Sequence, residues 1–510
     1  MELTLQRQMI TINEVVYDGY VEQPIECDAL LPDYCPDIVK VLKCGVTTHL
    51  HSTATSGDRL TVEGMAVAHI YYSSEKNHIR HVEYKIPFGK SVDLRSAPHS
   101  PVITVLPSVD YVNCRAVNQR RVDVRGAITF TVKVTDQKQE QVISGAEGAG
   151  IQLRRDMLPA TELVSQSKSP FSVAEELELG YGKSAIGSII RTDCRVNVQD
   201  HKVIAGKIVA KGDFMLHILY QPQEDEGALE VMEYSLPISQ IIDCAGVDEQ
   251  CICMVEMVCD SCDVQPKTGD DGEYRTFMLD ARITAMVSAY RHHEIPVASD
   301  CFSTKYECKC THRPVSFMRL SDMISESLIH KVTLDLPENV EKVVDAWCEV
   351  DTLNWKHEQN AINASLKLTV SMFARMENGE CLYFEQQSEM EQILPIQGVC
   401  AAIQFEPTAD ILSSTFNLVG KEKIDMRCEV LIKGCVHCTV RQNSIGDIAV
   451  DESSVKVKEQ NKLYIYYADE GESVWDIAKR YNTSPGAIWE ENAVEEDALG
   501  KKTMLLIPII

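Results

Sequence analysis

The sequence contains no long apolar segment. No apolar run approaches the ~18 residues needed to span a bilayer. The first eight residues, Met1 to Gln8, also lack the basic segment and following apolar segment of an export signal. We therefore expect a chain that stays in the cytoplasm, where its 19 cysteines would be reduced thiols, many of them buried as small apolar residues.

Positive charge is scarce as well. The 510 residues include 49 Lys and Arg against 76 Asp and Glu, which gives a formal net charge of −27. Nucleic acids and anionic lipid surfaces attract basic proteins, so this balance argues strongly against either as the general partner of the chain. The acidic excess also favours solubility.

Motifs of enzymatic chemistry are missing. The sequence has no nucleophile elbow, no zinc-protease helix and no phosphate-binding loop. The glycines at 145–150 have the wrong spacing and context for a dinucleotide-binding fingerprint and instead indicate a flexible joint. We therefore expect no catalytic residue, no cofactor and no enzymatic activity, and we interpret the chain as a binding protein.

Cysteines form the densest group of reactive side chains. Cys259 and Cys262 have a spacing that could place two thiolates on one zinc ion. A structural role is favoured, because Cys251 and Cys253 alternate along an expected strand. The sequence thus predicts no metal, with zinc at Cys259 and Cys262 as the weaker alternative. Oxidative cross-linking, which needs only accessible thiols, stays open.

About the first 450 residues contain a threefold sequence repeat. The anchor segments of the three copies are residues 36–41, 184–189 and 338–343. A short expected strand with a cysteine follows each anchor, at Cys44, Cys194 and Cys348. The repeat predicts three domains of similar structure.

Each copy has the pattern of antiparallel hairpins. A long strand with alternating apolar residues leads through a polar turn into a second strand, and the pattern recurs in the second half of the copy. The first such strand pairs are 60–72 with 82–88, 203–220 with 232–238, and 362–374 with 383–385. Alternation with period two and polar turns is typical of hairpins with one buried face.

The expected fold class is therefore mainly β. Three tandem antiparallel units, each a sandwich or an open barrel, precede a small C-terminal domain. The predicted boundaries are 1–148, 149–303 and 304–445 for the three units, 446–460 for a linker and 461–510 for the last domain.

The C-terminal stretch predicts a strand, two helices and a strand. Residues 463–467 are β-branched and aromatic, and Gly471 supplies the turn that follows. Ser473 is expected to cap the first helix, with Asp476 completing a capping box, and Ser484 with Pro485 begins the second. The expected core of this domain is Val474, Trp475, Ile477, Ala478, Tyr481, Ile488 and Trp489.

This pattern closely resembles the LysM module. The resemblance rests on residues 471–478 (Gly-Glu-Ser-Val-Trp-Asp-Ile-Ala), on Asn492 near the end of the second helix and on the closing Ile507-Pro508. It implies a shallow groove that usually binds N-acetylglucosamine-containing glycans. Carried over by position, the groove consists of Asp469, Gly471, Glu472, Ser473, Asn492, Ala493 and Val494.

A protein partner is at least as plausible for this groove as a glycan. Residues 461–510 carry nine acidic against five basic side chains, and the second loop of the groove continues as Glu495-Glu496-Asp497. Such a surface favours a partner with a basic face. In the purely structural alternative, Trp475 and Trp489 are only core residues and the groove binds nothing.

Three β units followed by a LysM module resemble the SPOCS-domain proteins of endospore-forming bacteria. The arrangement is similar to the clostridial coat-morphogenesis proteins whose LysM domain binds the ATPase named stage IV sporulation protein A. This resemblance implies a mother-cell scaffold at the forespore surface and spore coat, with that ATPase and other coat proteins as partners and with self-association open. The rival hypothesis is a LysM protein that binds peptidoglycan of the cell wall or spore cortex.

Overall fold

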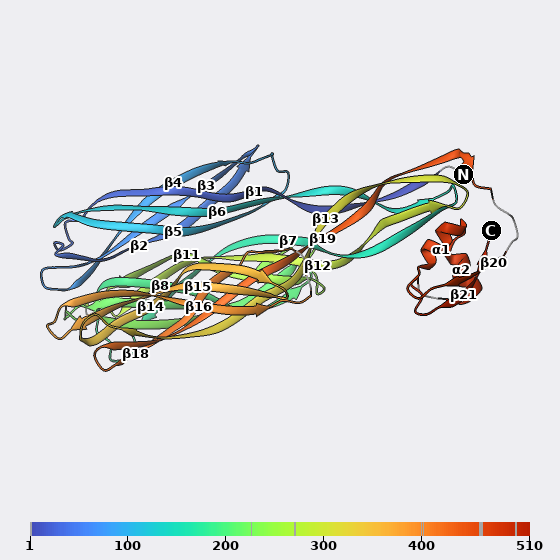
Figure 1. Ribbon diagram of the computed structural model, residues 1–510. Coiled ribbons are helices and arrows are strands. Elements are labelled where there is room, and N and C mark those ends of the chain that lie inside the picture. Colours follow the sequence, from blue (N-terminus) through green and yellow to red (C-terminus); the bar gives the residue numbers. More distant parts are fainter. Residues whose placement is uncertain are drawn as a thin grey trace.

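Antiparallel strands dominate the structure, a computed structural model (Figure 1). It describes residues 3–225, 227–269, 272–398, 400, 402–457, 463–494 and 497–509. Three successive β units are followed by a small module with two helices. The expected mainly β fold class is confirmed. Within the described ranges, the structure contains no helix with the length and apolar character of a membrane span.

The strands of each unit follow one another in the same order. Unit 1 consists of β1 (Thr4–Leu30), β2 (Lys40–Ser56), β3 (Arg59–Ser73), β4 (Ile79–Asp93), β5 (Pro101–Asn118) and β6 (Arg121–Glu147). Unit 2 consists of β7 (Ile151–Glu178), β8 (Ile186–Ile204), β9 (Lys207–Pro222), β10 (Glu230–Asp243), β11 (Ile252–Lys267) and β12 (Thr276–Ser303). Unit 3 consists of β13 (Tyr306–Asp335), β14 (Val340–Glu358), β15 (Ala361–Met376), β16 (Cys381–Pro395), β17 (Ile403–Phe405), β18 (Thr408–Val419) and β19 (Lys423–Val455).

Each unit is a sandwich of two antiparallel sheets. The inner sheet is a meander of the second to fourth strands, as in β2-β3-β4, and the outer sheet places the last strand between the first and the fifth, as in β1-β6-β5. Alternate residues of the middle strands point into the space between the sheets. In unit 2, Phe214 and Leu216 of β9 belong to the same buried cluster as Phe277 and Leu279 of β12. The period-two pattern of the sequence therefore produces a sandwich whose two sheets stay separate.

The first and last strands of each unit are much longer than the sandwich. Residue partners of β1 and β6 run from Thr4 and Glu147 to Leu30 and Arg121. The free halves of β1–β6, β7–β12 and β13–β19 form three ribbons that extend together, seen at the right of Figure 1. We call this part the stalk; its ribbons comprise residues 4–15 with 135–147, 151–163 with 290–303, and 306–320 with 437–455.

The stalk has a core of its own. Side chains from all three ribbons are buried against one another, among them Ile10, Val142, Ala160, Val297 and Phe317. A two-stranded ribbon alone is marginally stable in water, so the three ribbons stabilise one another by burying these faces.

A bulge marks the border between sandwich and stalk in every unit. The strand register shifts by one residue at Val16 of β1, Val164 of β7 and Ser321 of β13. An extra residue bends the strand and increases its twist. The threefold repeat of the sequence thus includes a repeated bend, which turns each long strand from its sandwich into the stalk.

Two segments differ from the sequence-based expectation. The expected joint at 145–150 is a continuation of β6 to Glu147 and a tight turn, in which Gly148 and Gly150 have φ of 92° and 67°. β19 continues to Val455, so residues 446–455 of the expected linker are strand, and residues 458–460 lie outside the described part. Both differences arise because pairing in the stalk extends the strands beyond the sandwich.

The inner sheets of the three units meet at the end opposite the module. A buried cluster there takes side chains from each unit: Tyr71 and Ile79 from unit 1, Ile190 and Leu219 from unit 2, and Trp347 and Phe373 from unit 3. We call this region the three-unit junction.

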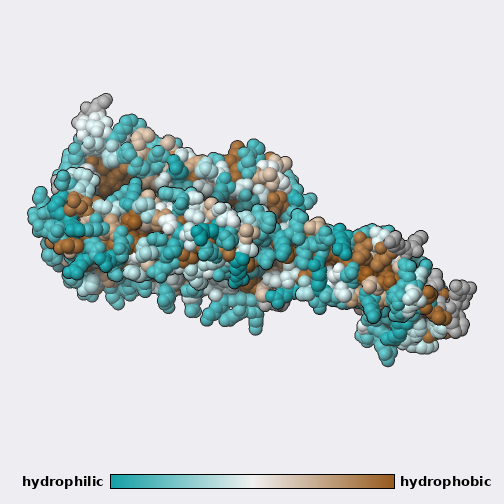
Figure 2. All heavy atoms as spheres, turned by 90° about the horizontal axis from the view of Figure 1, so that it is seen from above, coloured by the Kyte–Doolittle hydropathy of each residue, from teal (hydrophilic) through white to brown (hydrophobic). Residues whose placement is uncertain are grey.

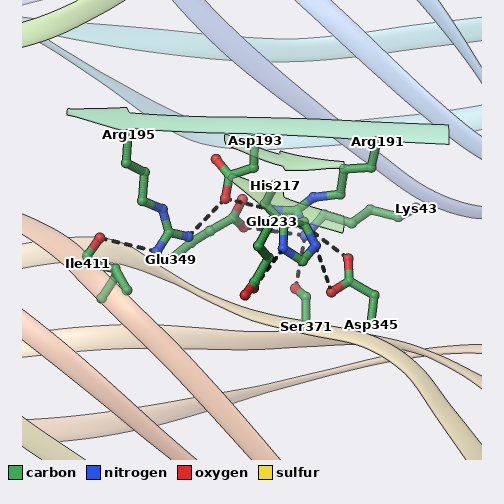
Figure 3. Close-up of polar contacts among 10 residues, drawn as sticks. All are labelled: Lys43, Arg191, Asp193, Arg195, His217, Glu233, Asp345, Glu349, Ser371 and Ile411. Carbon is green, nitrogen blue, oxygen red and sulfur yellow. Dashed lines mark hydrogen bonds and ion pairs between the residues drawn. The ribbon is translucent and has the colours of Figure 1, made fainter. Parts of the chain in front are cut away.

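A buried charge cluster lies beside the junction (Figure 3). Asp345 of β14 is only 2% exposed, and its carboxylate contacts Arg191 Nη1 of β8 at 3.2 Å and His217 Nε2 of β9 at 3.1 Å. The Arg191 guanidinium also lies 4.1 Å from the centre of the Trp347 ring. One carboxylate of unit 3 therefore pairs with two cationic groups of unit 2, which also contact Asp193 and Glu233 of their own unit at 3.2 Å each.

Further polar contacts at the edge of this cluster connect units 1 and 2 to unit 3. Lys43 Nζ of unit 1 donates to Ser371 Oγ of unit 3 at 3.1 Å. Arg195 of unit 2 pairs with Asp193 at 2.9 Å and donates to the Ile411 carbonyl of unit 3 at 3.1 Å. All three units are thus joined by polar contacts as well as by apolar burial (Figure 3).

Charge is favoured on both partners of the His217–Asp345 contact. Burial alone would lower the pKa of His217, but the Asp345 carboxylate outweighs this and raises it above its ordinary value of 6.5. Burial would raise the pKa of Asp345, yet the contacts with His217 and Arg191 keep it lowered.

We predict that Asp345→Asn destabilises the chain by about 3–5 kcal/mol, because it removes the almost fully buried carboxylate that faces both Arg191 and His217 and leaves Arg191 paired with the more exposed Asp193. Denaturant unfolding measures the change. Asp335→Asn is the matched control: it removes the carboxylate of an exposed pair with Lys423 in the same unit, where the expected loss is about 0–1 kcal/mol. Equal losses for the two variants would contradict a junction held by this charge pair.

We predict that the stability conferred by His217 depends on pH. A raised pKa in the folded state means that the contribution is fully present below pH 6.5 and is lost as the pH rises through the folded-state pKa. The difference in unfolding free energy between the native chain and His217→Gln should therefore shrink from pH 6 to pH 9. A difference that stays constant over this range would show that His217 is not charged in the folded state.

Candidate functional site

The C-terminal module has its elements in the expected order of strand, helix, helix and strand. They are β20 (Leu463–Ala468), α1 (Val474–Tyr481), α2 (Pro485–Asn492) and β21 (Thr503–Pro508). Of the expected core, Val474, Trp475, Ile477, Ala478 and Ile488 are buried, and Tyr481 and Trp489 are half-buried. The helices cover one face of the two-stranded sheet, whose inward residues Leu505 and Ile507 complete the core.

The two helices begin in different ways. At α2, the Ser484 hydroxyl accepts a hydrogen bond from the Ala487 amide at 3.1 Å, as the sequence predicts. At α1, Ser473 has the cap position, but its hydroxyl donates to Asp497 Oδ2 at 2.9 Å. Asp497 itself accepts from the Trp475 amide at 2.9 Å. The side-chain cap of α1 therefore comes from the loop after α2, which no local pattern around Ser473 could reveal.

The loops that flank the predicted groove are joined by backbone hydrogen bonds. The Gly471 amide donates to the Leu499 carbonyl at 2.7 Å, and the Leu499 amide donates to the Glu472 carbonyl at 3.1 Å. Gly471 has φ of 82°, a conformation that favours glycine. Glu472 and Ser473 thus contact residues 497–499. Glu495 and Glu496, which contributed to the predicted acidity, lie outside the described residues.

Besides Ser473, two further side chains of the predicted groove form hydrogen bonds inside the module. Glu472 accepts from the Tyr466 hydroxyl at 2.6 Å and pairs with Arg480 at 3.6 Å. The Asn492 side chain bridges α2 to β21: it donates to the Leu506 carbonyl at 2.7 Å and accepts from the Leu506 amide at 2.6 Å. Their polar atoms hold the module together.

The remaining groove residues are more accessible. Asp469 and Ala493 are exposed, and Asp469 forms a surface ion pair with Lys502 at 3.0 Å. Val494 is half-buried and packs on the core. The surface that the groove offers to a ligand therefore consists mainly of backbone and of small or apolar side chains.

The module contacts the end of the stalk. Asp300, in the stalk part of β12, accepts from Trp475 Nε1 at 2.8 Å and pairs with Lys479 Nζ at 2.8 Å. The Trp475 ring also meets the Phe302 ring edge-on at a centroid distance of 5.0 Å. Trp475, expected as a core residue of the module, is buried at the boundary between module and stalk.

Two further residues of units 2 and 3 make polar contacts with the module at this interface. Arg154 of β7 pairs with Asp497 at 3.4 Å. Lys456, just after β19, donates to Asn482 Oδ1 at 2.8 Å and to the Ser303 carbonyl at 3.2 Å. Units 2 and 3 thus both hold the module in place.

The charge of Asp300 is favoured at this interface. Its burial would raise the pKa of the carboxyl, but the hydrogen bonds from Lys479 and Trp475 outweigh burial and lower it. Sequence analysis missed Asp300, Phe302 and Arg154, because these residues lie far from the module in sequence.

The cysteines do not assemble into one centre. Cys251 and Cys253 are buried in unit 2, whereas Cys308 lies at the end of the stalk, with its sulfur 3.9 Å from that of Cys301. Within the part of the chain that is described, no group of three or more His, Cys, Asp or Glu residues has the geometry of a metal site. Among the described residues, Cys259 and Cys262, the weaker zinc alternative, belong to no such group.

The comparisons with known proteins gave one family match. A family model described as "SipL, SPOCS domain" matches residues 37–117 and 185–267. No curated protein and no solved structure gives a significant match.

The two matched segments occupy the same place in the fold. The first spans β2 to β5 of unit 1 and the second spans β8 to β11 of unit 2, that is, the inner sheet and the fifth strand of each sandwich. The outer strands that form the stalk lie outside both segments. Over these two segments the chain is therefore similar to the SPOCS domain.

Proposed function

We propose that the chain is a non-enzymatic sporulation scaffold whose C-terminal module acts as a LysM domain. The module binds a coat-basement ATPase resembling stage IV sporulation protein A, and the chain thereby helps to assemble the coat on the forespore. The SPOCS match in two units carries this proposal. The order of elements in the module supports it further.

The surface of the module favours a protein partner. The outward face of its sheet is apolar: Leu463, Ile465 and Tyr467 of β20 are 52%, 61% and 75% exposed, and Met504 beside Tyr467 is 53% exposed. Apolar patches that remain exposed are typical of protein interaction sites. Figure 2 shows hydrophobic surface gathered at the end of the molecule that carries the module.

A glycan ligand is the second candidate function. It rests on the resemblance of the groove, but glycan binding requires polar groups that are free to meet sugar hydroxyls. The Glu472 carboxylate and the Asn492 amide are already hydrogen-bonded within the module, so the first candidate is favoured.

The position of the module suits a scaffold. The stalk holds it away from the three-unit junction, so the sandwiches stay accessible to other coat proteins while the module contacts its partner (Figure 1). If the partner is a polymer, many weak contacts add up to strong attachment by raising the effective concentration.

We predict that Ile465→Asp weakens binding of the full chain to the ATPase at least about tenfold, because a charge on the apolar face must be desolvated in the complex. Ile241→Asp is the matched control, since Ile241 of β10 is 58% exposed, close to the 61% of Ile465. Surface plasmon resonance with the immobilised ATPase measures both variants. A parallel sedimentation assay with insoluble peptidoglycan tests the rival function: binding to peptidoglycan with none to the ATPase would refute the scaffold proposal.

We predict that Asp300→Ala frees the module from the stalk without unfolding the sandwiches, because Trp475 and Lys479 lose a shared partner. Small-angle scattering should show a larger maximum dimension. Asp156→Ala is the control on the same stalk, where Asp156 bonds to Gln442. Unchanged dimensions in Asp300→Ala would mean that the other contacts suffice to dock the module.

A further inference from the structure

One cysteine occupies the same place in every unit. Cys44, Cys194 and Cys348 lie on β2, β8 and β14, the first strand of each inner sheet. The sequence repeat already places a cysteine at each of these positions. Only the structure shows what each of them faces.

Each of these cysteines contacts a second thiol from the opposite sheet. In unit 2, the sulfurs of Cys194 and Cys259 are 3.2 Å apart, and Cys259 lies on β11 of the outer sheet. In unit 1, Cys44 and Cys114 of β5 pack against the same buried cluster, and in unit 3, Cys348 and Cys428 of β19 belong to one buried cluster. In both pairs the neighbouring thiol raises the pKa of the first cysteine.

The contact recurs although the partner position does not. Cys114 and Cys259 belong to the fifth strand of their units, whereas Cys428 belongs to the last strand of unit 3. A simple duplication of one sequence position would have placed the third partner on β18. The feature common to the three units is the spatial pairing of two thiols across the sandwich.

These pairs lie where the fold has no backbone connection. β2 and β5 run in separate sheets, as do β8 and β11, and β14 and β19. Apolar packing holds the two sheets together there. A covalent bond between the thiols would therefore add a restraint that the hydrogen-bonded ladders do not supply.

We propose that the three pairs Cys44–Cys114, Cys194–Cys259 and Cys348–Cys428 are sites of oxidative modification, at which a disulfide fastens the two sheets of each unit. The oxidant is a low-molecular-weight disulfide such as oxidised glutathione. One protein thiolate attacks it and releases one small thiol, which leaves a mixed disulfide. The second protein thiolate attacks that bond and releases the second small thiol. Two protein thiols are thereby oxidised by two electrons and lose two protons, and the small disulfide is reduced to two thiols.

The three pairs differ in reactivity. In unit 1, the neighbouring Cys44 thiol lowers the pKa of Cys114, which is half-buried, so this thiol attacks most readily. In unit 2 both thiols are half-buried, and Cys262 packs against the same core as Cys194 and Cys259, which offers an alternative partner. In unit 3, Cys348 and Cys428 are buried, so oxidation there must await local opening.

The modification does not depend on the proposed binding function. Cys400 and Cys438 are already joined as a disulfide in unit 3, with their Cα atoms 5.7 Å apart, and the other 17 cysteines are free. The chain would thus pass from thiols to sheet-to-sheet disulfides when the surrounding thiol pool becomes oxidised.

The test uses the full chain, first reduced and then incubated with oxidised glutathione. Samples are alkylated at intervals, digested without reduction and examined by peptide mass mapping. We expect the Cys44–Cys114 link first, then Cys194 with Cys259 or Cys262, and Cys348–Cys428 last. Because these links close loops of about 65–80 residues, the melting temperature should rise by about 5–10 °C.

Cysteine variants distinguish disulfides between the two sheets from oxidation of other cysteines. Cys114→Ser should remove the first link and part of the rise in melting temperature. The matched control, Cys35→Ser, replaces another half-buried thiol of unit 1 and should leave both unchanged. Glutathione adducts at Cys114 and Cys259 without links across the sandwich would overturn the proposal. Because the mapping uses the native chain, this outcome can be recognised even if a variant fails to fold.

Discussion

The pairing of the first strand of each unit with its last strand is the constraint on which the structure depends. In unit 1, this pairing brings Thr4 beside Glu147 and Leu30 beside Arg121. It closes the unit, because it makes neighbours of strands that are far apart in the sequence. The same pairing extends beyond the sandwich and forms the stalk. Such non-local contacts are costly in loop entropy and form slowly, so the buried stalk core must compensate for that cost.

Apolar burial holds each unit together and also joins the units at the three-unit junction, where a buried charge cluster adds to it. Within each unit, two sheets bury aliphatic and aromatic side chains, as Phe214 and Phe277 do in unit 2. Between units, a charged carboxylate at Asp345 is almost fully enclosed with Arg191 and His217. A buried charge pair requires good geometry to be favourable, and it tolerates fewer arrangements than apolar packing does. We infer that the cluster fixes how the units are oriented relative to one another.

The stalk separates the C-terminal module from the three-unit junction. Its end carries the module through Asp300 and Phe302, while the sandwiches meet at the far end around Trp347. Asp300 follows the register shift at Ser299 in β12, and a bulge of this kind changes the direction in which the next side chains point. An irregularity in a long strand thus contributes to the position of the module.

The sequence by itself determined the parts of this protein that depend on local pattern. Alternating apolar residues gave the hairpins and the β class, the repeat gave three units, and Ser484 with Pro485 marked the start of α2. Tertiary structure alone decided what depends on residues that are distant in the chain. The stalk, the charge cluster around Asp345, the capping of α1 by Asp497 and the contact of Trp475 with Asp300 all belong to this group. The physical reason is that period and turn signals report which face of a strand or helix is buried, whereas the partner of that face is set by packing between elements that the linear pattern does not connect.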